Sequence, residues 1–287
     1  MSANRYYDEV AVVLGLHICG LGVVRSLACD PNIRILGVGK ESAVGKYSQY
    51  FDEVFTYLTD DYEEKLHILQ QINAKYNVVI PFPAGHDFWV NLLWQERKSL
   101  ENFIIDYNET VVKLMDKSYQ MKIARELEVP YPESLTVVKS NDLDKVEEFK
   151  FPIIVKPVER NRSHQVFRLK TFHTYIQFYR TIHKYLGQVS FIVSKMITGP
   201  DSSIYSYGSY AKDGNIIQDF TGRKLTQKPS HFGVAGLAET VQNHGVIREY
   251  SQRIIRKTIF SGISQIEFKK DRKTGIYYLM EVNPRSW

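Results

Sequence analysis

A pair of carboxylates that face each other across a β-hairpin constrains the fold of this chain more than any other sequence feature. Residues 264–285 show apolar alternation on both sides of a polar, glycine-containing turn, which is typical of two antiparallel strands. Pairing Asp271 with Tyr277 closes this turn and places Glu267 opposite Glu281. Because successive side chains point to opposite faces of a strand, we expect both glutamates on the same face.

The two faces of this predicted hairpin differ in chemistry. The face of the two glutamates also carries Gln265 and Asn283. The opposite face, which can enter the core, carries Ile266, Phe268, Met280 and Val282. Directly opposed like charges destabilise a bare sheet, but a hard cation between them would reverse that effect, and Mg²⁺ prefers oxygen ligands. The alternative is a solvated sheet face on which both glutamates turn outward.

The composition is ordinary for a globular protein. The 287 residues are 44% hydrophobic and 24% charged, and such a chain can bury two or three cores. The net charge of +5 comes without a long block of lysine and arginine, so we expect no nucleic-acid partner. A mildly positive charge suits small anionic substrates equally well. The first residues are polar and no apolar run approaches 18 residues. We therefore expect a cytoplasmic enzyme or binding protein without signal peptide or membrane span, and a homodimer remains open.

Strand and helix patterns divide the chain into three parts. Up to about residue 115, short apolar strands alternate with helical patterns, which predicts an α/β unit with a parallel, doubly wound sheet. Residues 116–198 and 199–287 are expected to form two α+β lobes. Within the last part, Asp213-Gly214 between two apolar runs is a strong signal for an antiparallel hairpin.

A glycine-rich turn, Gly15 to Gly22, follows the first apolar strand. Its spacing does not match the phosphate-binding glycine patterns, and no Lys-Ser or Lys-Thr pair follows. The glycines are instead expected to permit a tight strand-to-helix turn and close helix packing. His86 and Asp87 follow a later strand and would lie at the same carboxyl edge, where parallel sheets bind ligands. Alternatively, they cap the next helix.

Lys156 lies at the end of the apolar strand that begins at Ile153. Lysines are rarely buried without a partner. Its ammonium group is therefore expected either to reach solvent or to meet an anion, and the sequence alone leaves both alternatives open.

Four motifs, in this order and spacing, resemble those of the ATP-grasp ligases. They are Met115-Asp116-Lys117, Val155-Lys156-Pro157, the stretch from Ile192 to Asp201, and the stretch from Met280 to Arg285. The resemblance covers nearly the whole chain, and the Asn-Pro-Arg ending is similar to the carbamoyl-phosphate-synthase and D-aspartate-ligase branch. It implies an ATP-grasp fold with a Rossmann-like pre-grasp domain (1–115), a small lobe (116–198) and a large lobe (199–287).

The resemblance also implies which residues bind ATP and Mg²⁺. The two lysines that would contact the ATP phosphates are Lys117 and Lys156. The residues whose backbone would bind adenine are Ser194, Lys195, Met196 and Ile197, and Asp201 would bind the ribose hydroxyls. The ligands of Mg²⁺ would be Glu267, Glu281 and Asn283, three of the four residues on the polar face of the hairpin.

Basic residues would act on the transferred phosphate and the substrate. Arg285 matches a basic residue near that phosphate. The pair Arg223-Lys224 resembles one that some members aim at the substrate carboxylate or the γ-phosphate, although a charged strand end is an equal alternative. The residues that follow, 227–236, contain two glycines and would form either a lid that closes over the site or an ordinary surface loop.

Three features depart from the family pattern. Residues 158–164 contain no glycine where many members have a glycine- and serine-rich loop over the phosphates, and Ser194 stands where glutamate or glutamine is usual. Relatives of this branch continue beyond the Asn-Pro-Arg motif, whereas this chain ends at Trp287. The large lobe is therefore expected to be shortened at its C-terminus.

The implied activity is an ATP- and Mg²⁺-dependent carboxylate–amine ligation through an acyl phosphate. Its substrates would be a small-molecule carboxylate and an amine, with D-aspartate as a candidate from the branch resemblance. Two of these departures, the shortened C-terminus and the glycine-free segment, favour an alternative, an ATP-binding protein without catalysis. A second alternative is a Rossmann-type enzyme that binds NAD rather than ATP at the N-terminal turn.

Overall fold

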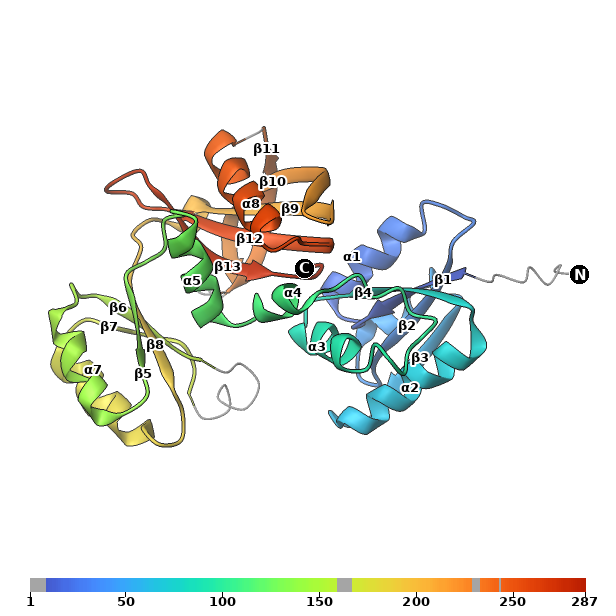
Figure 1. The fold of residues 1–287 in the computed structure, drawn as a ribbon, viewed down its shortest axis with the longest axis horizontal. Helices are drawn as coiled ribbons and strands as arrows, with labels where there is room; N and C mark the ends of the chain where they lie inside the picture. The colour runs from blue at the N-terminus through green and yellow to red at the C-terminus, as the bar shows by residue number, and fades with distance from the viewer. Residues whose placement is uncertain (1–8, 159–166, 229–232, 243) are drawn as a thin grey trace, which may run out of the picture.

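Three sheets, each with its own hydrophobic core, make up the molecule (Figure 1). The structure is a computed structural model and describes residues 9–158, 167–228, 233–242 and 244–287. The predicted phosphate-covering segment 158–164 lies, except for its first residue, outside the described residues. Among the described residues, no helix has both the length and the apolar character needed to cross a membrane.

The N-terminal unit is a parallel sheet with strand order β3-β2-β1-β4. Its strands are β1 (Glu9–Leu14), β2 (Arg34–Lys40), β3 (Glu53–Tyr57) and β4 (Val78–Pro83). Its helices are α1 (Ile18–Leu27), α2 (Tyr62–Lys75) and α3 (Asp87–Gln95), with a 3₁₀ turn η1 (Val44–Tyr47). The strands read as continuous apolar runs because both faces of the sheet are covered by other elements. The predicted parallel α/β unit is confirmed.

The glycine turn after β1 brings α1 close to the sheet, as expected. Gly15 has a φ of +111°, which side chains other than glycine rarely adopt. A Cβ atom on Gly20 would lie 1.9 Å from the carbonyl oxygen of Gly15. The turn is thus packed backbone against backbone.

The second sheet is antiparallel, with order β5-β8-β6-β7. Its strands are β5 (Ser134–Val137), β6 (Ile153–Pro157), β7 (Lys170–Phe172) and β8 (Phe191–Lys195). One face packs against α7 (Tyr175–Ile182), whose Phe178 and Ile182 are fully buried in the same core as Val155 and Val193. Helix α7 begins where Thr174 accepts a hydrogen bond from the Gln177 amide (3.3 Å), an N-cap that stabilises the first turn.

The third sheet is antiparallel, with order β11-β10-β9-β12-β13. Its strands are β9 (Ile204–Lys212), β10 (Asn215–Lys228), β11 (Val234–Val241), β12 (Gly262–Lys270) and β13 (Tyr277–Asn283). Its core includes residues from α4 (Glu109–Lys113), α5 (Lys117–Glu126) and α8 (Gly245–Lys257). Helix α8 buries Ile247, Ile254 and Ile255 along one stripe, the spacing that a helix needs to cover a sheet. Helix α5, which opens the predicted small lobe, therefore packs on the third sheet.

The hairpin of β12 and β13 follows the predicted register near the glutamates but not near the turn. Glu267 pairs with Glu281, whereas Tyr277 pairs with Lys270 rather than with Asp271. A β-bulge between the two regions inserts one extra residue into β13, which shifts the side-chain alternation beyond it. The prediction for Met280 was therefore wrong: Leu279 takes the core position (1% exposed), and Met280 is only half-buried.

The predicted loop 227–236 is largely a β-hairpin. Strand β10 extends to Lys228 and β11 begins at Val234, with Gln227 paired with Ala235. Residues 229–232 of this segment lie outside the described residues. The described part is thus held by ladder hydrogen bonds between two strands.

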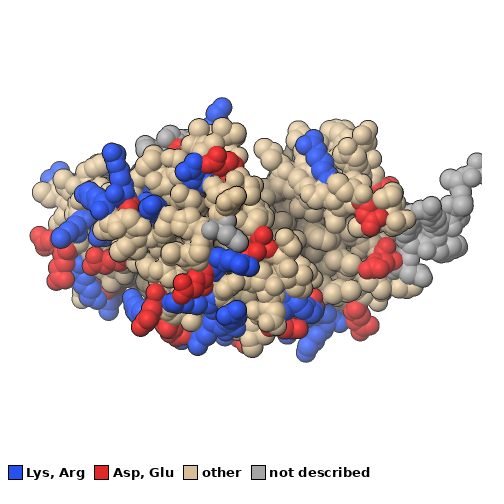
Figure 2. Space-filling view, turned by 90° about the horizontal axis from the view of Figure 1, so that it is seen from above, with Lys and Arg blue, Asp and Glu red and all other residues tan. Residues whose placement is uncertain are grey.

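The chain ends between the N-terminal unit and the third sheet (Figure 1). Ser286 pairs with Ala84, and its carbonyl oxygen accepts a hydrogen bond from the Gly85 amide (2.9 Å). On the face that Figure 2 shows, Lys and Arg side chains lie among Asp and Glu side chains. The net positive charge is therefore not gathered into one patch on that face.

Candidate functional site

The candidate site lies on the polar face of β12 and β13. Glu267 is opposite Glu281 and Gln265 is opposite Asn283, so the four side chains that were predicted to share a face do so. Gln265 and Asn283 are each only 5% exposed. The two carboxylates are thus set against each other beside a buried pair of amides.

Lys224 places a positive charge on this face. Its Nζ lies 2.6 Å from Glu267 Oε1, and the two side chains are 12% and 18% exposed. Strand β10 is separated from β12 by β9, so the lysine reaches across one strand. A cation therefore already neutralises one of the two opposed carboxylates, as the repulsion between them requires.

A row of amides and a guanidinium continues from Glu267 along the face. Gln265 Nε2 donates a hydrogen bond to Glu267 Oε1 (3.2 Å), and Asn283 Nδ2 donates to Gln265 Oε1 (3.1 Å). Arg285 Nη2 in turn donates to Asn283 Oδ1 (3.1 Å). This network fixes the orientation of two of the three predicted Mg²⁺ ligands, Glu267 and Asn283.

Asp87 holds Arg285 from the N-terminal unit. Arg285 Nε donates to Asp87 Oδ1 at 2.6 Å, and the arginine side chain is 8% exposed. Asp87 is the first residue of α3, so the carboxyl edge of the parallel sheet and the end of the third sheet meet at this ion pair. The sequence predicted the edge position of Asp87 but not its partner, because the two residues are 198 positions apart.

Tyr131 and Lys269 also belong to this region, although the sequence did not single them out. Burial, and after it the charge of Glu281, raise the pKa of Tyr131 to about 12. Burial lowers the pKa of Lys269, and the carboxylates of Asp201 and Asp271 oppose this effect. Lys269 lies two residues beyond Glu267 on β12, so strand alternation could have placed it on the same face.

The donor set fits Mg²⁺. Glu267, Glu281 and Asn283 offer only oxygen ligands, and a lysine ammonium already occupies one side of Glu267. In the part of the chain that the structure describes, no cluster of three or more His, Cys, Asp and Glu side chains could hold a metal. A Mg²⁺ site does not need such a cluster, because Mg²⁺ uses one or two carboxylates and completes its shell with water and phosphate oxygens.

The second sheet (β5-β8-β6-β7), which we call the small sheet, presents Lys156 and Ser194 on the face opposite α7. Lys156 pairs with Ile192 and Ser194 pairs with Ile154, whereas Val155 and Val193 point into the core on the α7 side. Ser194 is 9% exposed and shares a 2.8 Å hydrogen bond with Ser134. Its hydroxyl is thus engaged within the sheet, and Lys156 is half-buried.

The chain leaves β8 along the predicted adenine-binding stretch. Lys195 is exposed, Met196 is half-buried, and Ile197 is 3% exposed. Immediately after it, the Thr198 amide donates to Asp271 Oδ1 (3.1 Å), and the Arg272 amide donates to Thr198 O (3.0 Å). The exit from the small sheet is therefore fastened to the β12–β13 turn.

The three remaining predicted site residues have separate positions. Asp201 accepts hydrogen bonds from the amide (3.1 Å) and the side chain (2.9 Å) of Gln227. Lys117 is buried at the first position of α5. Arg223 pairs with Glu239 on β11 (2.5 Å), with both side chains more than a third exposed. The pair Arg223-Lys224 is thus divided between two different carboxylates.

Solved structures match this arrangement of three sheets, although no family model matches the chain and no curated protein matches its sequence. An L-amino acid ligase from Bacillus licheniformis has a TM-score of 0.72 at 14% identity, over 96% of this chain and 67% of its own. An N5-carboxyaminoimidazole synthetase from Staphylococcus aureus has a TM-score of 0.70 at 15% identity, over 98% and 71%. The chain has the ATP-grasp fold.

A third ATP-grasp structure is similar to the chain to the same degree. The biotin carboxylase domain of the Hydrogenobacter thermophilus 2-oxoglutarate carboxylase, complexed with MgADP and bicarbonate, has a TM-score of 0.69 at 14% identity. It matches 96% of this chain and 64% of its own length. At such identities the likeness establishes the ATP-grasp fold, and a substrate has to be argued from the site.

Proposed function

We propose that this protein is an ATP- and Mg²⁺-dependent carboxylate–amine ligase that acts through an acyl phosphate. The observation that carries the proposal is the opposed pair Glu267 and Glu281 beside Asn283. On this sheet face the ammonium group of Lys224 already pairs with one of the carboxylates. The ATP-grasp fold supports it, because the similar structures include a ligase and a domain in complex with MgADP.

In this proposal the two lobes hold ATP from opposite sides. Lys156 on the small sheet and Lys117 at the start of α5 offer positive charge for the phosphates, and Asp201 offers a carboxylate for the ribose hydroxyls. The adenine would lie along the backbone of residues 194–197. Bound Mg²⁺ would neutralise phosphate charge between Glu267 and Glu281, where the protein's own carboxylates would otherwise repel the nucleotide.

The chemical step needs positioning more than covalent help. A carboxylate oxygen of the substrate attacks the γ-phosphorus, and the bond to the oxygen bridging the β- and γ-phosphates breaks to release ADP. The amine then attacks the acyl carbon, loses a proton and displaces phosphate, which leaves an amide. Arg285, oriented by Asp87 at 2.6 Å, supplies a fixed positive charge near the phosphate in transfer, as electrostatic catalysis requires.

The Asn-Pro-Arg motif suggests one substrate. D-aspartate follows from the resemblance of the Asn-Pro-Arg motif alone, so it enters the experiments as one candidate acid among several. A second candidate function, ATP binding without ligation, is favoured by one contact: Lys224 occupies Glu267 at 2.6 Å and must share or leave that carboxylate when Mg²⁺ binds.

Isothermal titration calorimetry with a non-hydrolysable ATP analogue, with and without Mg²⁺, tests the nucleotide site. We expect Mg²⁺-dependent binding by the wild type and a loss of about tenfold or more in Glu281→Gln, since a neutral amide is a weaker ligand for a hard cation. The matched control is Glu249→Gln, whose carboxylate pairs with Arg253 on the exposed face of α8. Absence of binding by the wild type, or equal binding by Glu281→Gln, would contradict the proposal.

Release of ADP in the presence of carboxylates and amines then separates the two candidate functions. A ligase releases ADP only when an acid is present, and hydroxylamine traps the acyl phosphate as a hydroxamate. Tight Mg²⁺–ATP binding without ADP release for any acid would support the non-catalytic alternative.

A further inference from the structure

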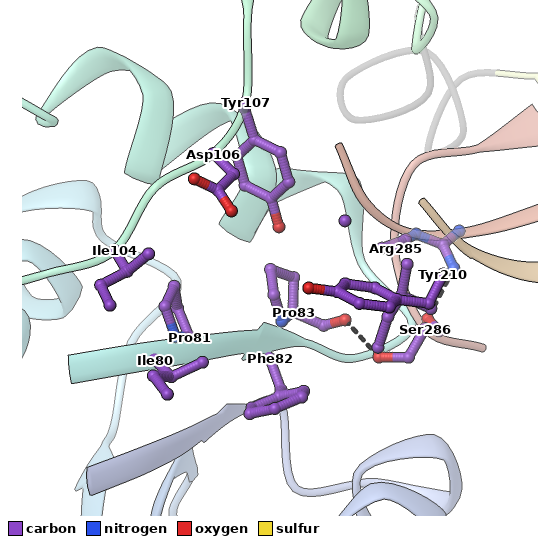
Figure 3. Close-up of a pocket in the computed structure, with 12 residues that line it drawn as sticks. Ile80, Pro81, Phe82, Pro83, Ile104, Asp106, Tyr107, Tyr210, Arg285 and Ser286 are labelled. Atoms are coloured by element: carbon purple, nitrogen blue, oxygen red, sulfur yellow. Dashed lines mark hydrogen bonds between the residues drawn. The ribbon is translucent and has the colours of Figure 1, made fainter. Parts of the chain in front are cut away.

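A pocket of about 500 Å³ lies between the N-terminal unit and the third sheet (Figure 3). Its walls come from the edge of β4 that faces away from β1, the segment after Phe103, the neighbouring ends of β9 and β12, and the chain end at Arg285 and Ser286. The apolar side chains that line it include those of Ile80, Pro81, Phe82, Pro83, Ile104 and Ile263. Its volume is in the range of pockets that enclose small organic ligands, about 300–1,000 Å³.

The pocket continues the sheet face that carries the two glutamates. Along β9 and β12, Ser206 pairs with Glu267, Gly208 pairs with Gln265, and Tyr210 pairs with Ile263. Alternation places these three rows on the same face, each about 7 Å from the next. Tyr210 and Ile263 line the pocket together with Arg285, which follows Asn283 by two residues. The pocket therefore begins about 14 Å from the glutamate row.

Two phenol hydroxyls point into the pocket. Figure 3 shows those of Tyr107 and Tyr210 directed from opposite walls toward the space above Pro83. Neither hydroxyl makes a hydrogen bond to another described residue. Burial, and after it the Asp106 carboxylate, raise the pKa of Tyr107 above its ordinary value, so this hydroxyl keeps its proton and can donate.

The charges at the pocket are distributed unequally. Asp106 at the mouth is paired with Lys212 at 2.8 Å, both side chains being well exposed. At the inner end lies Arg285, almost entirely buried, with one ion pair to Asp87. Its guanidinium carries five N–H donors, more than its contacts to Asp87, Asn283 and the Ser286 carbonyl use.

We propose that this pocket holds the apolar side chain of a carboxylic acid, and that this acid is the substrate that the ATP-grasp site phosphorylates. The assignment of the acid as substrate rests on the proposed ligase function. The body of the acid lies against the prolines, Phe82 and Ile263. Its carboxylate accepts hydrogen bonds from Tyr107 and Tyr210 and faces the positive charge of Arg285, at the end nearest Asn283.

The lining favours an aryl or branched alkyl acid over an acid with a charged side chain. A second carboxylate in a pocket walled by Ile, Pro and Phe would lose its hydration without a cation to pair with, because Lys212 is held by Asp106 at the mouth. D-aspartate therefore serves as the comparator that the pocket should reject.

Ligand-observed NMR titrations of the full chain without nucleotide test the pocket directly. The probe is 3-phenylpropionate; the comparators are 3-phenylpropan-1-ol, which lacks the carboxylate, and D-aspartate, which lacks the apolar body. We expect the probe to bind about tenfold or more tightly than either comparator. Equal binding of D-aspartate, or no binding of the probe, would overturn the proposal.

Two kinds of variant locate the binding. Ile104→Trp places a larger side chain at a residue that is 47% exposed in the pocket wall, so it fills the pocket without disturbing a core. Ile176→Trp on α7, where the isoleucine is 63% exposed, is the matched control. We expect Ile104→Trp to weaken probe binding about tenfold or more, with Tyr107→Phe and Tyr210→Phe weakening it less and Ile176→Trp unchanged. Equal effects of the two tryptophans would overturn the location.

An ADP-release assay with Mg²⁺–ATP and hydroxylamine separates the substrate assignment from the pocket. We expect 3-phenylpropionate to stimulate ADP release by the wild type and by Ile176→Trp, and not by Ile104→Trp. Probe binding without stimulation, in a chain that binds Mg²⁺–ATP, would overturn the substrate assignment alone. Failure of the wild type to bind ATP would overturn the proposed function and with it the substrate assignment, while the NMR titration still decides whether the pocket binds the acid.

Discussion

The two faces of the β12–β13 hairpin use the same backbone for opposite purposes. On one face Ile266, Phe268, Leu279 and Val282 are each no more than 3% exposed and form part of a core with α5 and α8. On the other face the same two strands set Glu267 against Glu281. The first arrangement stabilises the fold through burial of apolar area, whereas the second costs stability unless a cation is supplied.

The difference shows where the sheet depends on distant parts of the chain. The apolar face is covered by α5 and α8, two amphipathic helices whose pattern can be read from the local sequence. The polar face is completed by single charged residues: Lys224 from two strands away and Asp87 from the N-terminal unit. Substitutions on the apolar face should therefore destabilise the fold. Substitutions on the polar face should instead change how the protein depends on ions and ligands.

The largest expected effect is on the apolar face. Phe268→Ala should lower the free energy of unfolding by about 3–5 kcal/mol, because it leaves a cavity in a fully buried site. Ile276→Ala, at a 43% exposed residue of the same hairpin, should change it by less than about 1 kcal/mol. Urea unfolding at two or more protein concentrations measures both. A loss by Phe268→Ala that Mg²⁺ reversed would contradict the separation of the two faces.

The next effect separates the protein's own cation from an added one. Lys224→Met should destabilise the protein by about 1–3 kcal/mol in the presence of EDTA, because Glu267 loses its charged partner on a largely buried face. Mg²⁺ should then raise the melting temperature of this variant more than that of the wild type, since no lysine competes for the carboxylate.

Lys212→Met is the control for that experiment. It removes a lysine whose ion pair with Asp106 is well exposed, and exposed pairs contribute about 0–1 kcal/mol. Equal shifts by Mg²⁺ in wild type, Lys224→Met and Lys212→Met would show that the ion does not bind at the glutamates.

The sequence predicted the polar face better than its surroundings for a physical reason. The pairing of Glu267 with Glu281 follows from alternation within a short hairpin, which depends only on neighbouring residues. The bulge that exchanged Met280 for Leu279 depends on how β13 fits the core. To predict the contact of Lys224 with Glu267, one must know that β9 lies between β10 and β12, and no local pattern shows this order.

The pocket could not be predicted from the sequence, for the same reason. Its walls come from five separate stretches of the chain, around Pro81, Ile104, Tyr210, Ile263 and Arg285, that meet only when the third sheet packs against the edge of β4. The ATP-grasp fold itself was predictable, because four motifs in order resemble that superfamily even without a single specific match. The residues that position the motifs are side chains with no pattern of their own, such as Asp87.

A smaller effect is expected at the link between the two units. Asp87→Asn keeps the shape of the side chain but removes the charge that faces Arg285 at 2.6 Å, so stability should fall by about 1 kcal/mol. If Arg285 acts on the phosphate, the rate of acid-dependent ADP release should fall about tenfold or more, and Asp87→Glu should restore part of it. Glu109→Gln, in an exposed pair with Lys113 (2.8 Å), is the control. Equal turnover by Asp87→Asn and wild type would remove Asp87 as a positioning residue.

The smallest effect, and the one with a defined pH dependence, is at the fastening between the small sheet and the hairpin turn. Burial alone would raise the pKa of Asp271, but hydrogen bonds from Thr198 and Thr274 outweigh it and hold the pKa below its ordinary value. A carboxyl group whose pKa is lower in the folded than in the unfolded state stabilises the fold above the unfolded pKa of about 3.9, and this contribution disappears as the pH falls through the folded value.

Asp271→Asn should therefore lower stability by about 0.5–1 kcal/mol at pH 7, and the difference from wild type should shrink below about pH 4. Thermal unfolding from pH 7 to pH 3 measures this, with Glu148→Gln on the exposed surface of the small lobe as control. Because the bond joins the exit of β8 to the turn of the hairpin that carries the glutamates, the variant should also weaken binding of the ATP analogue more than Glu148→Gln does. A pH-independent difference would show that Asp271 acts through its shape and not its charge. Equal binding of the ATP analogue by Asp271→Asn and Glu148→Gln would show that the two lobes are fastened elsewhere.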